Sequence, residues 1–596
     1  MEYRTFSYEP LQPRQIRVLQ FTPSPHPSNI ISARCIHMTL DHQSQNYVAV
    51  SYAWGSMQKS CQMLLNGRIL NITENVHNVF RSKITDDPNT RVWIDAVCIN
   101  QEDLVEKASQ VRLMGEVYSN AENTRIWIGL ASSSSDLAIH FIKTLFSILP
   151  ELETGDPERI NHYYAIYPSH CPEWTALAHF LNRPWFARTW VIQEVVLATH
   201  ASIVCGEAIL TWDILDRVMV GLHELGIDGL IDATTNYDSG FSLVILAPPG
   251  LPTVIGLSIL RKRVRDKKPR PILRVMAMFR NSLTTEENDK IFAMLGVATD
   301  VADPIFYPDY TKPSGTLFRD ITKFLMKRDA SLDALRYAGL DKGPRALSVP
   351  SWAVRSFLSV GSSSHLGNFS VTTSNQPNFL FSDSSDCLRL RAFIFDKVCR
   401  LGSMCVAYKD GQILGEDETS HYFEWFLQAK WIAQSTTLSE EVFWRTLLAN
   451  RVTSTKDVSF DGLDQPPDQS WGKDFKAFEP FFALSLRSSP EEGRQLLASH
   501  EGLKAMKFRG QMSRAIGRRR FGVLSSGSLG LMPHEAQVGD LVAAFLGAKV
   551  LFVIRPLPAV KDEVTQYQLV GECYVHDRMD GQVMDLGLEI RDIVLI

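Results

Sequence analysis

The chain has 596 residues, more than a single hydrophobic core usually supports, so we expect roughly two to four domains. Apolar residues make up 45% of the sequence and charged residues 21%, which excludes a disordered or fibrous protein. The net charge of −5 provides no overall attraction to nucleic acid or to anionic lipid, so we expect neither as a partner.

The cysteines and the N-terminal residues indicate the compartment. The nine cysteines are scattered, odd in number and never spaced as CxxC, which favours reduced thiols over a disulfide framework or a zinc site. We therefore expect no bound metal. The N-terminal stretch MEYRTFSYEPLQPRQ lacks the apolar core and the small-residue cleavage site of a signal peptide. Together these features predict a cytoplasmic protein.

The first half of the chain alternates strands and helices. Apolar runs rich in β-forming residues predict strands at 47–52, 91–97 and 124–130. A helix is predicted between the second and third of these strands, and a strand–helix–strand unit with short connections produces a parallel sheet. The sequence therefore predicts an α/β domain.

Local signals define further elements of this half. Residues 61–73 (CQMLLNGRILNIT) predict a hairpin that turns at Asn66-Gly67. Asn100 is predicted to cap the following helix, with Asp103 at the third position. The stretch RTWVIQEVVLA (188–198) is predicted to be the last helix of the block.

One apolar stretch needs a membrane test. Residues 241–260 (FSLVILAPPGLPTVIGLSIL) are uncharged over the length of a membrane-spanning helix. Pro248, Pro249 and Pro252 lie near its centre, where each would break backbone hydrogen bonding in lipid. We predict two buried segments joined by a proline turn. The basic RKRVRDKKPR that follows is predicted to be a solvated surface, although nuclear import or an anionic surface would also suit it.

The second half changes character along its length. Residues 255–345 read as mainly helical, and the last part of the chain contains short apolar strands separated by Gly and Pro, which are typical of a small barrel or sandwich. The predicted organisation is an N-terminal extension, an α/β domain, a mainly helical region, a mixed region with loops and a β-rich C-terminal domain. Their predicted bounds are 1–46, 47–200, 201–360, 361–519 and 520–596.

Three sequence blocks point to a family. They read YVAVSYAWG, VWIDAVCINQEDLVEKASQVRLMGEVYSNAENTRIWIG and RPWFARTWVIQEV, in this order. Together they resemble the fungal heterokaryon incompatibility (HET) domain over about residues 47–198. Shorter similarities extend from FSYEPLQPRQIRVL near the start to GSLGLMP and LVGECYVHDRMDG near the end. The sequence contains no Gly-rich phosphate loop, GxGxxG, HExxH or GxSxG motif.

The resemblance implies both a role and a fold. HET proteins act in fungal self/non-self recognition, where incompatible alleles trigger cell death after hyphal fusion. The domain is also similar to the TIR fold, a flavodoxin-like parallel sheet. TIR enzymes cleave the N-ribosidic bond of NAD with a glutamate in a tryptophan-x-x-x-glutamate pattern, which Trp190 and Glu194 reproduce. The resemblance thus implies Glu194 as the catalytic residue and NAD as the substrate, with no required cofactor, and assembly with a protein partner or with itself.

Ligands of open α/β sheets bind beyond the carboxyl ends of the strands. The predicted binding residues are those at the two strand ends, together with the tryptophan of the helix: Ser51, Tyr52, Trp54, Gly55, Asp95 and Trp190. Trp54 is expected to stack on a nicotinamide or adenine ring. Asp95 is expected to accept a hydrogen bond from a ribose hydroxyl.

A non-enzymatic interpretation uses the same residues. A carboxylate inside an apolar helix costs several kcal/mol unless it is paired, hydrogen-bonded or protonated. An ion pair of Glu194 with Arg188, Arg91 or Arg112 would meet that cost without catalysis. Asp95 would then cap a helix and both tryptophans would fill the core. In this alternative the domain is a TIR-like interaction module.

Overall fold

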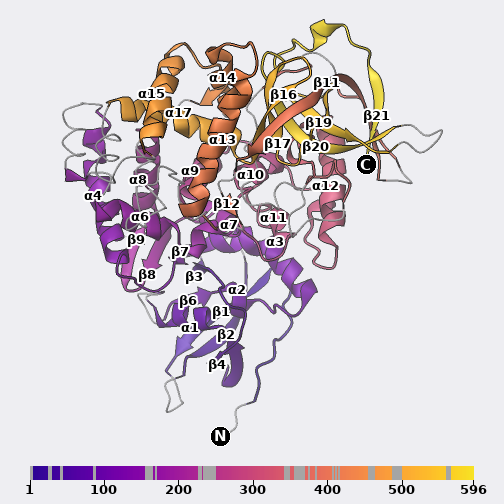
Figure 1. The fold of residues 1–596 in the computed structure, drawn as a ribbon. Helices are drawn as coiled ribbons and strands as arrows, with labels where there is room; N and C mark the ends of the chain where they lie inside the picture. Colours follow the sequence, from indigo (N-terminus) through magenta and orange to yellow (C-terminus); the bar gives the residue numbers. More distant parts are fainter. Residues whose placement is uncertain are drawn as a thin grey trace. The chain divides into compact units, whose positions relative to one another are not determined.

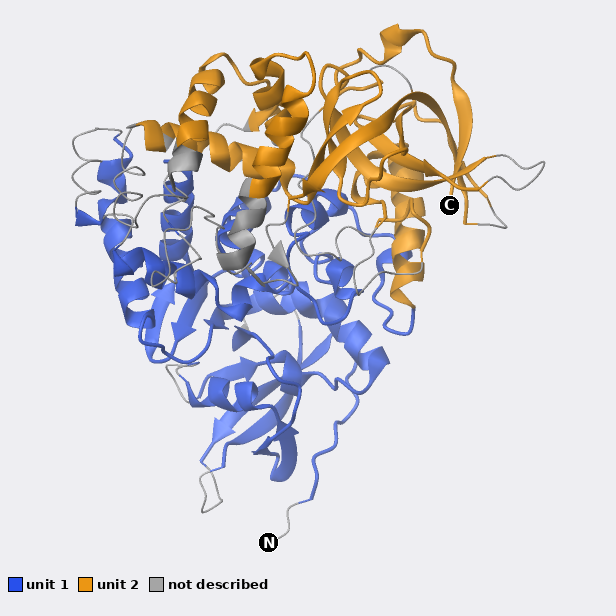
Figure 2. Cartoon of the chain, in the orientation of Figure 1, with its two compact units in different colours: residues 1–167, 171–231, 247–312 blue, residues 168–170, 232–246, 313–596 orange. Residues whose placement is uncertain are grey.

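A computed structural model describes residues 4–596 with several gaps (Figure 1). The residues outside the description are 24–29, 41–44, 83, 85–88, 155–165, 168–170, 226–230, 232–249, 341–348, 355–368, 373–375, 383–385, 406–407, 410–411, 414–415, 454–463, 486–499 and 559–564. The chain forms two compact units (Figure 2). Unit 1 comprises residues 1–167, 171–231 and 247–312, and unit 2 comprises 168–170, 232–246 and 313–596.

Unit 1 is built on one mixed sheet. Within the described residues its strands follow the order β5-β4-β2-β1-β6-β3-β7-β8-β9. Their bounds are β1 (Gln15–Thr22), β2 (Ser32–Thr39), β3 (Gln45–Tyr52), β4 (Cys61–Leu65), β5 (Arg68–Ile72), β6 (Arg91–Trp93), β7 (Ala121–Trp127), β8 (Ala201–Cys205) and β9 (Ala208–Thr211). The four central strands, β6-β3-β7-β8, are parallel to one another. The predicted parallel pairing of β3, β6 and β7 is therefore confirmed.

The sheet extends beyond the predicted strands on both sides. The segment 1–46 contributes β1 and β2, and β1 pairs antiparallel with β6. The segment 201–211 contributes β8 and β9, which form an antiparallel pair. Antiparallel strands thus border the parallel centre.

Two local predictions need correction. The strand predicted over 91–97 ends at Trp93, and residues Asp95–Cys98 form the short helix α2. The Asp95 carboxylate accepts a hydrogen bond from the Ala96 amide at 2.7 Å, a local bond that competes with strand pairing. The cap of helix α3 (Leu104–Asn120) is Asp103, which accepts from the amides of the first turn. The Asn100 side-chain oxygen instead accepts the Glu102 amide at 3.3 Å, before the helix begins.

The hairpin prediction is confirmed. β4 and β5 pair in register through Leu65 and Arg68, and the turn is Asn66-Gly67. Both turn residues have positive φ values, 52° and 71°, as a type I′ turn requires.

Helices connect and cover the strands of unit 1. They are α1 (Glu74–Arg81), α2, α3, α4 (Ser135–Leu152), α6 (Pro172–Leu181), η1 (Pro184–Ala187), α7 (Val191–Val196), α8 (Trp212–Glu224), α9 (Gly250–Arg265), α10 (Ile272–Met278), α11 (Asp289–Phe292) and η3 (Pro304–Phe306). Helix α3 packs on β3 and β7 and also contacts α7 (Figure 1). The predicted last helix of the block is therefore confirmed as the short α7, held between α3 and α9.

The stretch 241–260 is partly described. Residues 241–249, with the first two prolines, lie outside the described part of the chain, and the remainder belongs to α9. No helix among the described residues combines the length and hydropathy needed to cross a bilayer. The basic segment after it is not wholly solvated, because Arg261 donates to the carbonyls of Val195 and Ala198.

Unit 2 joins helices to a closed β-barrel. Its helices are α12 (Ser314–Asp329), η4 (Asp333–Tyr337), α13 (Glu416–Gln434), α14 (Glu440–Leu447), α15 (Ser470–Ser485), α17 (His500–Ile516) and η5 (Met584–Leu586). Its main strands are β10 (Phe379–Phe381), β11 (Leu388–Met404), β16 (Arg519–Leu524), β17 (Leu529–Pro533), β18 (Leu541–Phe545), β19 (Leu551–Pro556), β20 (Gln566–Val575) and β21 (Arg591–Leu595). The sheet runs from β11 through β16, β17, β20 and β19 to β18, which pairs again with β11. The predicted β-rich C-terminal part is confirmed.

Short strands complete unit 2. These are β12 (Tyr408–Lys409) with β13 (Gln412–Ile413), and β14 (Val452–Thr453) with β15 (Asp464–Gln465). The barrel core is mainly apolar and includes a stacked pair of rings, Phe545 and Phe552, whose centroids lie 4.6 Å apart.

Candidate functional site

Helix α7 carries the candidate carboxylate and is fixed at both ends. Before its first turn, the Thr189 hydroxyl lies 2.7 Å from the Ser282 hydroxyl, and the Thr189 amide donates to the Leu283 carbonyl. At its C-terminal end the Arg261 guanidinium donates to the Val195 carbonyl. A cation at this end also complements the helix dipole. Side chains on α7 are therefore held in a defined place although the helix has only six residues.

Gln193, the first of the two polar residues inside the apolar run, has a structural role. It is buried, and its Nε2 donates to the Phe292 carbonyl at 3.1 Å. Its Oε1 faces Gly115 and Gly296, whose Cα atoms approach each other. The Gln193 side chain thus joins α3, α7 and the segment after α11, at a point where Gly115 and Gly296 have no room for side chains of their own.

A substitution at Gly296 tests this close approach. A Cβ atom on residue 296 would lie 2.2 Å from Gln193 Oε1, so the amide or the backbone must move. We expect Gly296→Ala to lower the free energy of unfolding by about 1–3 kcal/mol, measured by urea denaturation. In a Gln193→Ala background the same substitution should cost much less, because the blocking oxygen is gone; an equal cost in both backgrounds would contradict the contact.

Glu194 is the buried carboxylate of the site. Its exposed fraction is 2% and that of Ser51 is 1%. The Ser51 hydroxyl donates to Glu194 Oε2, and the Trp185 indole N–H donates to Ser51 Oγ at 2.7 Å. The three side chains form one hydrogen-bonded chain that ends on the carboxyl group.

The predicted arginine partners lie elsewhere. Arg91 contacts the Met38 sulfur, and Arg112 lies over the Tyr307 ring. Arg188 donates to the Tyr52 carbonyl. Among the described residues, Glu194 forms no ion pair with any of these arginines.

The surroundings of Glu194 shift its ionisation. Burial raises the pKa of its carboxyl group to about 7, against the lowering effects of the Arg188 charge and the Ser51 hydrogen bond. The carboxyl group therefore changes charge near neutral pH. Carboxyl groups with this property are typical of acid–base sites.

Asp95 forms a second carboxyl centre close to the first. Its Oδ2 accepts the Trp54 indole N–H at 2.8 Å, and its Oδ1 accepts the Ala96 amide. Burial raises the pKa of Asp95, while Arg188 and the hydrogen bonds from Trp54, Ala96 and Tyr52 oppose that shift. The pKa of the Tyr52 hydroxyl is well above its ordinary value, chiefly through burial. The Trp54 N–H is thus committed to Asp95, which fixes the indole ring.

Gly55 lies where its conformation requires glycine. Its φ is +66°, and a Cβ there would meet the Asn75 side chain at 2.5 Å. The Asn75 amide in turn donates to the Ala53 carbonyl at 2.9 Å. The residue shapes the turn after β3.

The sheet topology places this cluster at the carboxyl ends of two neighbouring parallel strands. After β3 the chain passes through the β4–β5 hairpin and α1 to β6, all on one side of β3. After β7 it passes through helices to β8, on the other side. The carboxyl ends of the neighbours β3 and β7 therefore form a topological switch point, where open α/β sheets bind their ligands. Ser51 and Tyr52 end β3 there, opposite Ile126 and Trp127.

Trp190 belongs to a different cluster. Its indole N–H donates to Asp289 Oδ2 at 3.0 Å, and the Tyr310 hydroxyl donates to Asp289 Oδ1 at 2.9 Å. Its polar contact therefore lies with α11, and the tryptophan-x-x-x-glutamate spacing does not bring its N–H to the Glu194 carboxyl.

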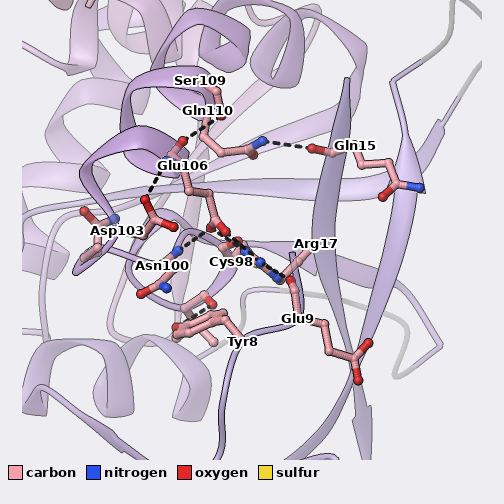
Figure 3. Close-up of polar contacts among 12 residues, drawn as sticks. Tyr8, Glu9, Gln15, Arg17, Cys98, Asn100, Asp103, Glu106, Ser109 and Gln110 are labelled. Atoms are coloured by element: carbon pink, nitrogen blue, oxygen red, sulfur yellow. Dashed lines mark hydrogen bonds and ion pairs between the residues drawn. The ribbon is translucent and has the colours of Figure 1, made fainter. Parts of the chain in front are cut away.

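A buried ion pair supports the end of α2 and the residues that follow it (Figure 3). Arg17, on β1, is fully buried and donates to both carboxylate oxygens of Glu106 at 2.6 and 2.9 Å. Arg17 also donates to the Cys98 carbonyl, and Glu106 Oε1 accepts the Asn100 amide at 2.7 Å. The pair thereby joins β1 and α3 to the segment between α2 and α3.

Sequence reasoning did not identify Arg17, Glu106 and Trp185 as parts of this environment. The blocks that suggested the family include Arg17 and Trp185 within FSYEPLQPRQIRVL and RPWFARTWVIQEV. The one local indication of a buried ion pair is Arg17 itself, which stands between apolar residues of a strand.

Comparisons with known proteins agree with this organisation. Residues 47–194 match the model of the heterokaryon incompatibility protein (HET) family, and residues 487–596 match the Het-6 beta-barrel domain. The chain is similar to "Heterokaryon incompatibility protein 6, OR allele" of Neurospora crassa, with 23% identity over 94% of this chain and 93% of that protein. No solved structure matches the chain significantly. The chain thus contains a HET domain in unit 1 and a Het-6 β-barrel domain in unit 2, and it is a distant homologue of the Neurospora protein over 94% of its length.

Proposed function

We propose that this protein acts in self/non-self recognition and regulated cell death, and that its HET domain hydrolyses the N-ribosidic bond of NAD with Glu194 as the reacting carboxyl group. The Neurospora protein named for heterokaryon incompatibility supports the biological role. Support for the chemistry comes from the site itself. The assembly of the protein with itself or with a partner through the HET domain belongs to the same proposal.

One observation carries the chemical proposal. Glu194 is buried at the switch point of the sheet, hydrogen-bonded by Ser51 and without an ion pair among the described residues. A purely structural carboxylate at this depth would be expected to have an arginine or lysine partner. A carboxyl group with a pKa of about 7 is instead suited to accept a proton at cellular pH.

The reaction requires little from the protein beyond this group. The C1′–N bond breaks, and the bonding electron pair leaves with nicotinamide, which builds positive charge on the ribose. Water adds to C1′ and loses a proton, so the products are ADP-ribose, nicotinamide and one proton. The ionised Glu194 would stabilise the developing charge and accept the proton of the water.

A non-catalytic interaction module is the second candidate. The observation that favours it is the 2% exposure of Glu194, since Ser51 already satisfies one of its oxygens. In that case Glu194 would organise α7 against β3, and function would depend on an assembly surface.

Incubation of the purified full-length protein with NAD separates the two candidates. Nicotinamide and ADP-ribose should appear in equal amounts, with a rate per molecule that rises with protein concentration if assembly activates the enzyme. If no nicotinamide is released at any concentration, while the protein still assembles, the interaction module is correct.

The pH dependence of the rate provides an independent prediction. Because the reactive form of Glu194 is the carboxylate, the rate of nicotinamide release should rise with pH through about 7 and level off above it. Ser51→Ala removes a hydrogen bond that lowers the pKa of Glu194, so the midpoint should move to higher pH. A midpoint that does not move in Ser51→Ala would contradict the assignment to Glu194.

A further inference from the structure

Arg188 occupies an unusual position next to this site. It follows η1 directly and is half-buried. In the described part of the chain its guanidinium forms one hydrogen bond, from Nη1 to the carbonyl of Tyr52, the last residue of β3. Its other N–H groups are accessible to solvent, since no atom of Arg188 is among the buried polar atoms without a hydrogen-bond partner.

The charge of Arg188 is also not neutralised by a direct partner. It acts on two carboxyl groups, since it lowers the pKa of both Glu194 and Asp95. Neither forms an ion pair with it among the described residues, and Asp95 is already bound to Trp54 and Ala96. A planar group with several free donors is suited to bind an anion with two oxygens, such as phosphate.

A second arginine nearby provides a contrast. Arg183, at the other end of η1, donates to the carbonyls of Ile128 and Leu130 and to the Ser135 hydroxyl. Its donors are used to fix the chain after β7. Of these two arginines, Arg188 alone retains donors for a ligand at the carboxyl end of β3.

We propose that the Arg188 guanidinium binds a phosphate group of the substrate, so that the site accepts phosphorylated nucleotides and discriminates against the corresponding nucleosides. This inference rests on the proposed function, because it assigns a substrate class to the same site. The phosphate would lie against the Arg188 guanidinium, beyond Tyr52 at the carboxyl end of β3, and the ribose would point inward to Glu194. Arg188 thus becomes a specificity determinant of the HET domain.

The test measures binding without turnover. All variants are made in a Glu194→Gln background, which prevents hydrolysis and also removes the effect of Arg188 on the ionisation of Glu194. Calorimetry then compares the affinity for NAD with that for nicotinamide riboside, which has the same N-ribosidic bond but no diphosphate. The added substitutions are Arg188→Gln and Arg188→Lys. Arg112→Gln is the control for the loss of one positive charge, because the Arg112 guanidinium lies over the Tyr307 ring and has no role in the proposed site.

Arg188→Gln should weaken NAD binding at least about tenfold, the loss of one charge-assisted contact, and leave nicotinamide riboside binding unchanged. Arg188→Lys should retain part of the NAD affinity, and Arg112→Gln should retain all of it. Unchanged NAD affinity in Arg188→Gln, an equal loss for both ligands, or no NAD binding before the change would overturn the proposal. If the wild-type protein binds NAD through Arg188 but releases no nicotinamide, the proposed hydrolysis fails and this inference stands.

Discussion

Glu194→Gln is expected to raise the free energy of unfolding above pH 7, by about 3 kcal/mol relative to the wild-type protein. The wild-type carboxyl group has its pKa raised from 4.5 to about 7 in the folded state. The folded protein therefore binds this proton more tightly than the unfolded chain. The resulting stabilisation is complete below pH 4.5 and is lost as the pH rises through 7, whereas the glutamine carries no such penalty.

The measurement is urea denaturation of both proteins at several pH values between 5 and 8. The difference between them should be small at pH 5 and largest at pH 8. Glu122→Gln, an exposed position on β7, provides a control that should show no such trend. A Glu194→Gln protein that is less stable than wild type at pH 8 would indicate a stabilising ion pair and would contradict the present assignment.

In contrast to Glu194→Gln, loss of the charge on Glu106 is expected to lower the free energy of unfolding, because Glu106 forms an ion pair with Arg17. Glu106→Gln leaves the guanidinium of Arg17 without its negative partner, and that side chain is fully buried. Removal of one partner of a buried pair costs about 3–5 kcal/mol. We therefore expect a large fall in the stability of unit 1, and the segment between α2 and α3 should lose protection in hydrogen exchange.

A matched control is the ion pair of Arg14 and Glu116. Arg14 directly precedes β1 and Glu116 lies on α3, but their side chains are 47% and 39% exposed. Glu116→Gln should cost about 0–1 kcal/mol. Equal losses for Glu106→Gln and Glu116→Gln would show that burial does not set the strength of the Arg17 pair.

Much of the fold could be predicted because its signals are local. The apolar runs of β3, β6 and β7 identify a parallel sheet, and Asn66-Gly67 determines the hairpin turn. The incorporation of β1 and β2 into that sheet, and of β11 into the barrel, depends on pairing between distant segments. Local patterns of polarity do not contain that information, so these strands could not be assigned to their sheets.

The candidate site shows the same division. The resemblance implied Glu194, the position at a strand end suggested Ser51, and the structure joins their side chains directly. The same pattern suggested Trp190, but its indole contacts Asp289, a residue 99 positions away. Trp185 reaches Ser51 across 134 positions, which no local spacing could indicate. Residue types suggested a chemistry, while long-range contacts determined which of those residues share an environment.

The initial rate of nicotinamide release from NAD at pH 8 is the most direct measurement of the proposed chemistry. It should be made with equal amounts of folded wild-type protein and Glu194→Gln, under conditions in which both assemble alike. We predict steady release by the wild type and a rate at least about 100-fold lower in the variant, the usual effect of losing a general base. Equal rates in the two proteins, or no release by the wild type in any assembled form, would contradict catalysis by Glu194.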